Sequence, residues 1–118
     1  MTTLVKRKLR PQTADELWTV LTEIFPGFSA HCEDEEIQPE TTLHFVMTDF
    51  TTYFSGNRDT FSESQLRKLA LFINNAVSVG DNLENAIGTC FLEHLRQVRG
   101  YKILAPFLSR QAKDKTHA

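Results

Sequence analysis

Apolar residues recur at helical spacing along most of the chain, in runs separated by short polar segments. The first run predicts a helix over residues 13–25, because TADE at its start is a capping box and apolar residues follow at intervals of three and four. The FPGF segment at residues 25–28 is expected to stop this helix through its proline and glycine. The acidic segment SAHCEDEEIQPE that follows is expected to be a loop.

A second helix is predicted over residues 39–54, with Pro39 at its first position. Its apolar residues fit a period of 3.6 better than a period of 2. The aromatic residues and threonines of LHFVMTDFTTYF leave a strand as the alternative. On the helix, Phe45 falls nearly opposite the apolar stripe, on the side of Asp49.

Two more helices and a final helical element follow. SESQ, which begins at Ser62, is a second capping box and starts a helix predicted to end near residue 78. Gly80 lies in a tight turn where a left-handed residue is favoured. The next helix is predicted over residues 81–99, with Cys90 and His94 on its core-facing stripe. The last element, YKILAPFLSRQAKDK, is expected to be helical around and after its proline.

These elements predict an all-α fold, a bundle or short superhelix of four to five helices joined by short turns. The 118 residues are expected to hold a single helical domain over residues 11–112. Residues 1–10 are predicted to be a flexible basic arm, and residues 113–118 a loose tail. No signal peptide or run of about 18 apolar residues is visible. Together with the two cysteines, which form no disulfide framework, this predicts a cytoplasmic protein without a membrane anchor.

Charge is distributed unevenly along the chain. The net charge is only −2, but residues 11–57 contain nine acidic residues and no lysine or arginine. The remaining residues carry all 13 basic and the other six of the 15 acidic residues, so the two parts sum to −9 and +7. An acidic surface of this kind would steer a basic protein and raise its association rate. The residues expected to meet such a partner are Glu33, Asp34, Glu35, Glu36, Glu40, Phe45 and Asp49.

The basic residues support a different use of charge. Arg96, Arg99 and Lys102 lie close together in RQVRGYK, and the basic arm precedes the first helix. They could contact the phosphates of a nucleic acid. The isoelectric point near 6.1 argues against strong duplex binding, so nucleic acid is the less favoured partner.

Neither cysteine is expected to form a catalytic or metal site. Cys90 and His94 are four residues apart and would be adjacent on one helix face, but a buried free cysteine and a hydrogen-bonded histidine account for them. His31 and Cys32 precede consecutive acids, which do not converge on one ion. No catalytic or nucleotide-binding motif is present, so we expect no enzyme, no metal and no cofactor.

The segment FSESQLRKLALFINNAVSVGDNLENAIGTCFLEHL, followed by ILAPFL, resembles small helical bacterial proteins of uncharacterised function, some of them immunity-like. The resemblance covers residues 61–112 and rests on a packing pattern. It implies a bacterial all-α protein and transfers no catalytic residue.

The function expected from the sequence is therefore non-enzymatic protein binding. An immunity-like protein would use its acidic surface to occlude a basic partner. The alternative is a small helical regulator that binds nucleic acid through the arm and residues 96–102. The nine phenylalanines add a homodimer as a further expectation.

Overall fold

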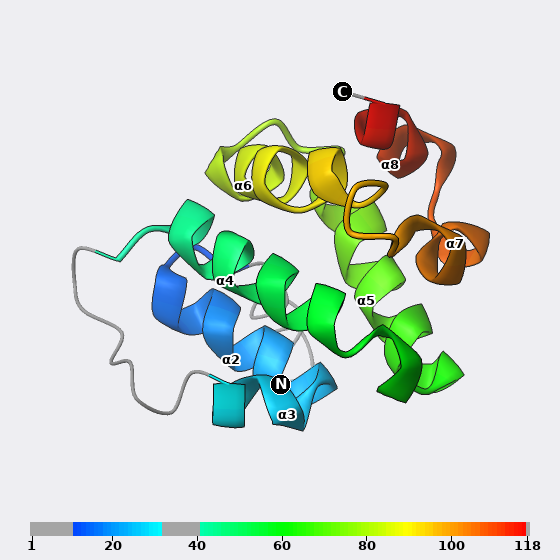
Figure 1. Cartoon of the computed structure of the whole chain (residues 1–118). Helices are drawn as coiled ribbons and strands as arrows, with labels where there is room; N and C mark the ends of the chain where they lie inside the picture. Colours follow the sequence, from blue (N-terminus) through cyan, green and yellow to red (C-terminus); the bar gives the residue numbers. More distant parts are fainter. Residues whose placement is uncertain (1–10, 32–40, 118) are drawn as a thin grey trace, which may run out of the picture.

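The computed structural model describes residues 11–31 and 41–117 (Figure 1). The α-helices are α2 (Ala14–Ile24), α3 (Pro26–His31), α4 (Leu43–Gly56), α5 (Glu63–Ala76), α6 (Asn82–Cys90), α7 (Tyr101–Leu104) and α8 (Arg110–Asp114). The 3-10 turns are η1 (Arg58–Thr60), η2 (Leu92–His94), η3 (Ala105–Phe107) and η4 (Lys115–His117). The predicted all-α fold is confirmed, because every regular element in these two ranges is helical. The basic arm predicted over residues 1–10 lies outside them.

The predicted helix starts at the three capping sequences are confirmed. The Thr13 hydroxyl accepts a hydrogen bond from the Glu16 amide at 3.1 Å, at the start of α2. Ser62 and Gln65 form a complete capping box ahead of α5, each side chain accepting from the other residue's amide. Asp81 caps α6. Each cap satisfies an amide that the helix itself leaves unpaired, which fixes where the helix begins.

The first helix stops at the FPGF segment as predicted, since α2 ends at Ile24, but Pro26 also begins the short helix α3, because its fixed φ suits a first helical turn. The predicted start of the second helix is wrong. The helix α4 begins at residue 43, where the Thr42 hydroxyl accepts from the Phe45 amide at 3.1 Å. Pro39 lies outside the described residues. Because residues 43–56 are helical, the strand alternative for this segment is also excluded.

The helix predicted over residues 81–99 ends at Cys90. Phe91 leaves the helical conformation, with φ −124° and ψ −62°, and the Thr51 hydroxyl donates to the Cys90 carbonyl at 2.6 Å. Phe91 and Leu92 are both fully buried. The chain changes direction at this break, and both side chains lie in the core.

The helices form two sides around the core (Figure 1). One side contains α2, α3 and α4, and the other contains α5 to α8. In Figure 1, α2 and α4 run side by side in the same direction, unlike the antiparallel neighbours that short turns usually produce. The packing of α4 against α6 joins the two sides. No helix in the described segments has the length and apolarity that crossing a membrane would need.

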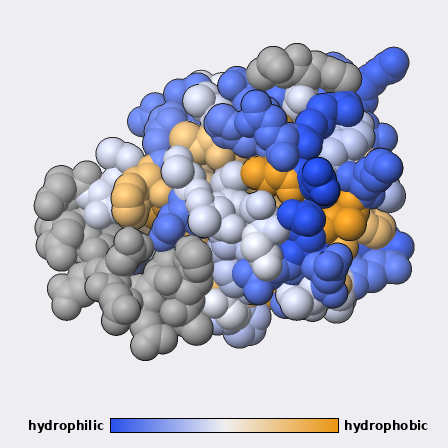
Figure 2. All heavy atoms as spheres, viewed as in Figure 1, coloured by the Kyte–Doolittle hydropathy of each residue, from blue (hydrophilic) through white to orange (hydrophobic). Residues whose placement is uncertain are grey.

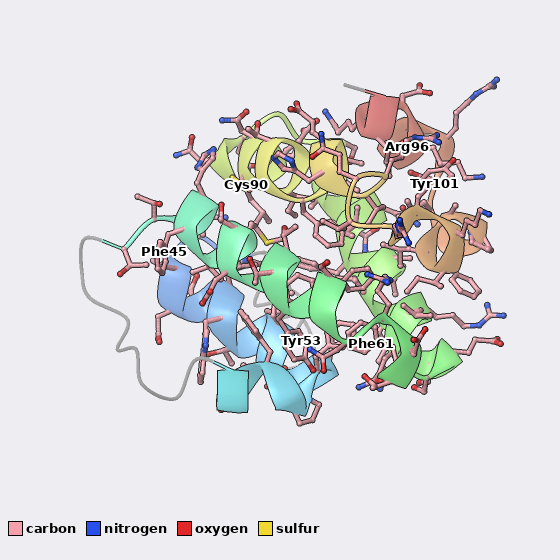
Figure 3. The ribbon with its side chains drawn as sticks, in the orientation of Figure 1. Phe45, Tyr53, Phe61, Cys90, Arg96 and Tyr101 are labelled. Carbon is pink, nitrogen blue, oxygen red and sulfur yellow. The ribbon has the colours of Figure 1, made fainter. Side chains whose placement is uncertain are left out.

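Aromatic rings fill the centre of the core. Phe50 of α4 has ring centroids of Phe28, Phe25 and Phe91 at 5.3, 5.4 and 5.6 Å. Tyr53 lies in the same cluster near Phe61 (Figure 3). Burial raises the pKa of its phenol. The high phenylalanine content therefore reflects core packing that spans both sides of the molecule.

The amide side chain of Asn74 links α5 to the C-terminal helices. Asn74 donates from Nδ2 to the Phe107 carbonyl at 3.1 Å, and its Oδ1 accepts from the Ser109 amide at 2.8 Å. Leu104 and Leu108 are buried, so the C-terminal segment packs its leucine side chains into the core. The segment predicted as a loose tail is helical as far as residue 117, and Thr116 is only 2% exposed.

Glu84 ties the start of α6 to this C-terminal segment. Its carboxylate forms an ion pair with Lys115 at 3.0 Å and accepts from the Gly80 amide. Burial raises the pKa of Glu84, but these hydrogen bonds lower it more, so the pKa lies below its ordinary value of 4.5. A carboxyl group with a lowered folded pKa contributes stability above the unfolded pKa, and this contribution is lost as pH falls through the folded value.

We therefore expect Glu84→Gln to destabilise the fold most near neutral pH. The difference in unfolding free energy from the wild type should shrink as pH falls below 4.5. Urea unfolding over a pH series measures it. Lys115→Met should remove part of the same pH dependence, since it deletes the ion-pair partner. If the difference in unfolding free energy stayed constant until Glu84 was fully protonated, the lowered pKa assigned to Glu84 would be wrong.

Candidate functional site

The side of the molecule formed by α2, α3 and α4 carries acidic charge only. Residues 11–57 contain no lysine or arginine, and the acids among the described ones are Asp15, Glu16, Glu23 and Asp49. The three on α2 are exposed, and Asp49 on α4 is half-buried. We call this surface the acid-only side. Because α2 and α4 pack side by side, the described acids of residues 11–57 lie on one side of the molecule.

Phe45 is the large apolar residue exposed on the acid-only side. Its side chain is 50% exposed on the first turn of α4, and Figure 3 places it at the edge of the molecule. Asp49 lies one turn further along the same face. Phe45 thus has the two properties that an interface anchor needs: its aromatic ring is exposed, and charged residues lie around it. Trp18 and Tyr53 add no comparable exposed ring, because they are half-buried and buried.

The other predicted partner-binding residues, Glu33, Asp34, Glu35, Glu36 and Glu40, lie outside the described residues. The structure therefore brings together only Phe45 and Asp49 from that set, and adds the α2 acids to them.

The second candidate surface is the turn that follows η2, together with the first two residues of α7. We call this segment, residues 95–102, the basic turn. Arg96, Arg99 and Lys102 are all exposed. The Arg96 guanidinium lies over the Tyr101 ring, 3.8 Å from its centroid (Figure 3). Figure 2 shows hydrophobic surface, in orange, among strongly hydrophilic residues over this turn and α7. The three predicted nucleic-acid residues are therefore brought together on one short, partly apolar segment.

The basic turn ends in a helix-terminating motif with an unusual residue. The Gly100 amide donates to the Leu95 carbonyl at 2.9 Å, and the Arg99 amide to the Arg96 carbonyl at 3.2 Å. This pair of bonds defines a Schellman motif, in which the residue before the last is usually a left-handed glycine. Here that residue is Arg99, with φ +60°. Left-handed backbone is unfavourable for residues with a Cβ, so Arg99 is held in a strained conformation.

Packing explains why the glycine comes one residue later. A Cβ on Gly100 would lie 2.6 Å from the Phe54 ring and 2.9 Å from Leu95. The turn is also anchored to the end of α4, since Arg58 donates to the carbonyls of Ser55 at 2.8 Å and Val98 at 3.1 Å. The basic turn is thus fixed by core contacts below it while its cations face outward.

The structure does not place Cys90 and His94 on one helix face. Because α6 ends at Cys90, the expected adjacency of residues four apart is lost. Cys90 is half-buried and packs against the core. His94 is exposed, contrary to the prediction that it lies on the core-facing stripe, and its Nδ1 lies 3.1 Å from Gln97 Oε1. The arrangement does not form a nucleophile–base pair on α6.

The other histidines do not form a metal site among the residues that the structure describes. No group of three or more potential ligands is gathered there. His44 has its Nε2 3.1 Å from the Asn85 amide nitrogen, a contact that joins the first turns of α4 and α6. Cys32, the neighbour of His31 that was considered with it as a metal ligand, lies outside the described residues.

Sequence reasoning did not identify the stacking of Arg96 on Tyr101 or the contact of Arg58 with the basic turn. The spacing of an arginine five residues before a tyrosine, in RQVRGY, was a visible signal for the stacked pair. Nothing in the sequence pointed to the contact between Arg58 and Val98, which joins residues 40 positions apart. Long-range contacts to backbone carbonyls depend on the fold and leave no local pattern.

Comparison with known proteins gives the family. Neither the curated proteins nor the solved structures contain a significant match to the chain. One family model matches residues 18–115, which include α4 to α8 and most of α2. The matched range therefore contains the basic turn and the acid-only side except the first turn of α2, which carries Asp15 and Glu16. The chain belongs to the family described as Domain of unknown function (DUF7674).

Proposed function

We propose that this protein is a non-enzymatic binding module whose acid-only side covers a basic protein partner. The observation that carries the proposal is Phe45, half-exposed on a surface that has acidic but no lysine or arginine side chains. A buried aromatic contact at the centre of an interface supplies affinity, and surrounding charges supply steering and specificity.

The charge of the acid-only side favours a basic partner over an acidic or neutral one. Asp15, Glu16 and Glu23 are exposed on α2, and Asp49 follows Phe45 on α4. A field of one sign raises the association rate of an oppositely charged protein and repels like charge. Binding would occlude the partner sterically, as an immunity-like protein does, and needs no chemical step.

Substitution of Phe45 tests the proposal directly. Immobilised wild-type protein is expected to retain a basic protein from the source organism's lysate at low salt and release it at high salt. Phe45→Ala should weaken that binding by about 2 kcal/mol, roughly thirtyfold in Kd, the loss typical of an interface hot spot. Its stability should change by less than about 0.5 kcal/mol, because the side chain is outside the core. Calorimetric titration with the purified partner measures the affinity.

Leu71→Ala is the matched control. Leu71 is 62% exposed on α5, on the other side of the molecule, so its loss should leave the affinity unchanged. For charge, Glu23→Gln should slow association, whereas the same substitution at exposed Glu93 should not. Equal effects of Phe45→Ala and Leu71→Ala on one partner would refute the proposed face. Binding that strengthens with salt would refute the electrostatic part.

A further inference from the structure

The strain at Arg99 has no explanation in the packing of the fold. Among the described residues, its guanidinium has no hydrogen-bond or ion-pair partner, and neither has the Lys102 ammonium. Glycine has no Cβ and would adopt the left-handed conformation of Arg99 with less backbone strain. An exposed residue that is retained in a strained conformation without a structural partner indicates a binding role.

Arg96 beside it is pre-arranged for anion binding. Its guanidinium is held 3.8 Å above the centroid of the Tyr101 ring, so the plane of the group is fixed before any ligand arrives. A guanidinium held in this way keeps its N–H edge available for a phosphate oxygen. The Arg58 hydrogen bond to Val98 and the close packing of Gly100 on Phe54 keep the backbone below it in place.

The segment that contains the basic turn is positively charged despite the net charge of −2. Residues 85–113 contain five lysines and arginines and one acid, Glu93. The acid-only side is formed by α2 to α4 and not by this segment. A short flexible strand can contact the basic turn alone.

We infer that the basic turn is a binding site for the phosphate backbone of single-stranded nucleic acid, with Arg96, Arg99 and Lys102 as the contacting cations. The half-buried Tyr101, Val98 and Ile103 give the site an apolar floor against which the sugar and base edges can pack. This inference is independent of the proposed protein partner, because the two surfaces share no residue.

Fluorescence anisotropy with a labelled short single-stranded oligonucleotide tests the inference. For three phosphate contacts, the logarithm of the binding constant should fall with the logarithm of salt concentration with a slope of about −2. Arg99→Gly should weaken binding about tenfold and reduce the slope by about 0.7. The same variant should unfold at a higher urea concentration than the wild type, since glycine relieves the left-handed strain. A variant that is more stable yet binds less distinguishes a binding role from a structural one.

Two further variants control for charge and conformation. Arg99→Lys keeps both the charge and the strain, so it should bind within a few-fold of wild type and show no stability gain. Arg110→Gln removes an equal charge from exposed α8 and should leave the salt slope unchanged. Failure of the oligonucleotide to bind, equal binding of polyglutamate, or unchanged binding by Arg99→Gly would each overturn the inference. A loss of stability in Arg99→Gly would also overturn it, because Arg99 would then serve the fold.

Discussion

Replacing Phe50 with alanine is expected to lower the free energy of unfolding by about 3–5 kcal/mol. The side chain is fully buried at the junction of both sides of the molecule, with rings of Phe25, Phe28 and Phe91 between 5.3 and 5.6 Å away. Its removal deletes aromatic contacts from three other elements and leaves a cavity that the surrounding rings cannot fill. Chemical unfolding, followed by circular dichroism, measures the loss.

The control for this prediction lies on the same helix. Phe45→Ala removes the same side chain from α4, but from a half-exposed position, and should change stability by less than about 0.5 kcal/mol. Phe50→Leu should cost less than Phe50→Ala, because most of the volume remains. Similar losses at positions 45 and 50 would contradict the arrangement of the core.

Gly100→Ala is expected to destabilise the protein by about 1–3 kcal/mol. The added methyl group would lie 2.6 Å from Cε2 and 3.2 Å from Cδ2 of the Phe54 ring, and 2.9 Å from Leu95 Cδ1. Phe54 is fully buried among other aromatic rings and has no space into which to move. The backbone at this position is not left-handed, so the cost arises from packing alone.

Gly56→Ala is the matched substitution for Gly100→Ala. No atom lies within 4 Å of the position where its Cβ would be, and the residue ends α4. Alanine at a helical position without steric conflict should stabilise the protein by roughly 0.5–1 kcal/mol. In the same urea assay, Gly100→Ala should lower the free energy of unfolding, and Gly56→Ala should raise it. A neutral Gly100→Ala would show that the turn does not pack against Phe54 as described.

The helix starts could be predicted because they depend on local contacts. Thr13, Ser62 and Asp81 each bond to an amide three residues away, and that spacing is visible in the sequence. The position of Phe45 opposite the apolar stripe also followed from periodicity. Its exposure was left open by the sequence, and the structure shows the side chain 50% exposed.

The end of α6 could not be fixed in this way. Helical periodicity continues past Cys90 in the sequence, but the chain leaves the helix at Phe91, next to the contact of the Thr51 hydroxyl with the Cys90 carbonyl. The prediction for His94 depended on an unbroken helix and failed with it. Tertiary packing determines where a helix stops when no glycine or proline marks the place.

The candidate sites were predicted in part. Arg96, Arg99 and Lys102 were recognised as a cluster from their closeness in sequence. The left-handed backbone of Arg99 and the anchoring by Arg58 depend on contacts with α4 and could not be read from RQVRGYK. The consecutive acids that first suggested a protein-binding surface lie outside the described residues, so that surface now rests on α2 and α4.

The described part of α2 to α4 carries acids without lysine or arginine, whereas the basic turn carries three exposed cations, and this arrangement gives the molecule an electric dipole moment. Its net charge of −2 says little about how it behaves near another charged body, because the dipole turns the molecule before contact. A positively charged matrix would be met by α2 and α4, which would leave the basic turn facing solvent. A polyanion would turn the molecule the other way. Orientation during encounter, more than overall attraction, is what this charge distribution provides.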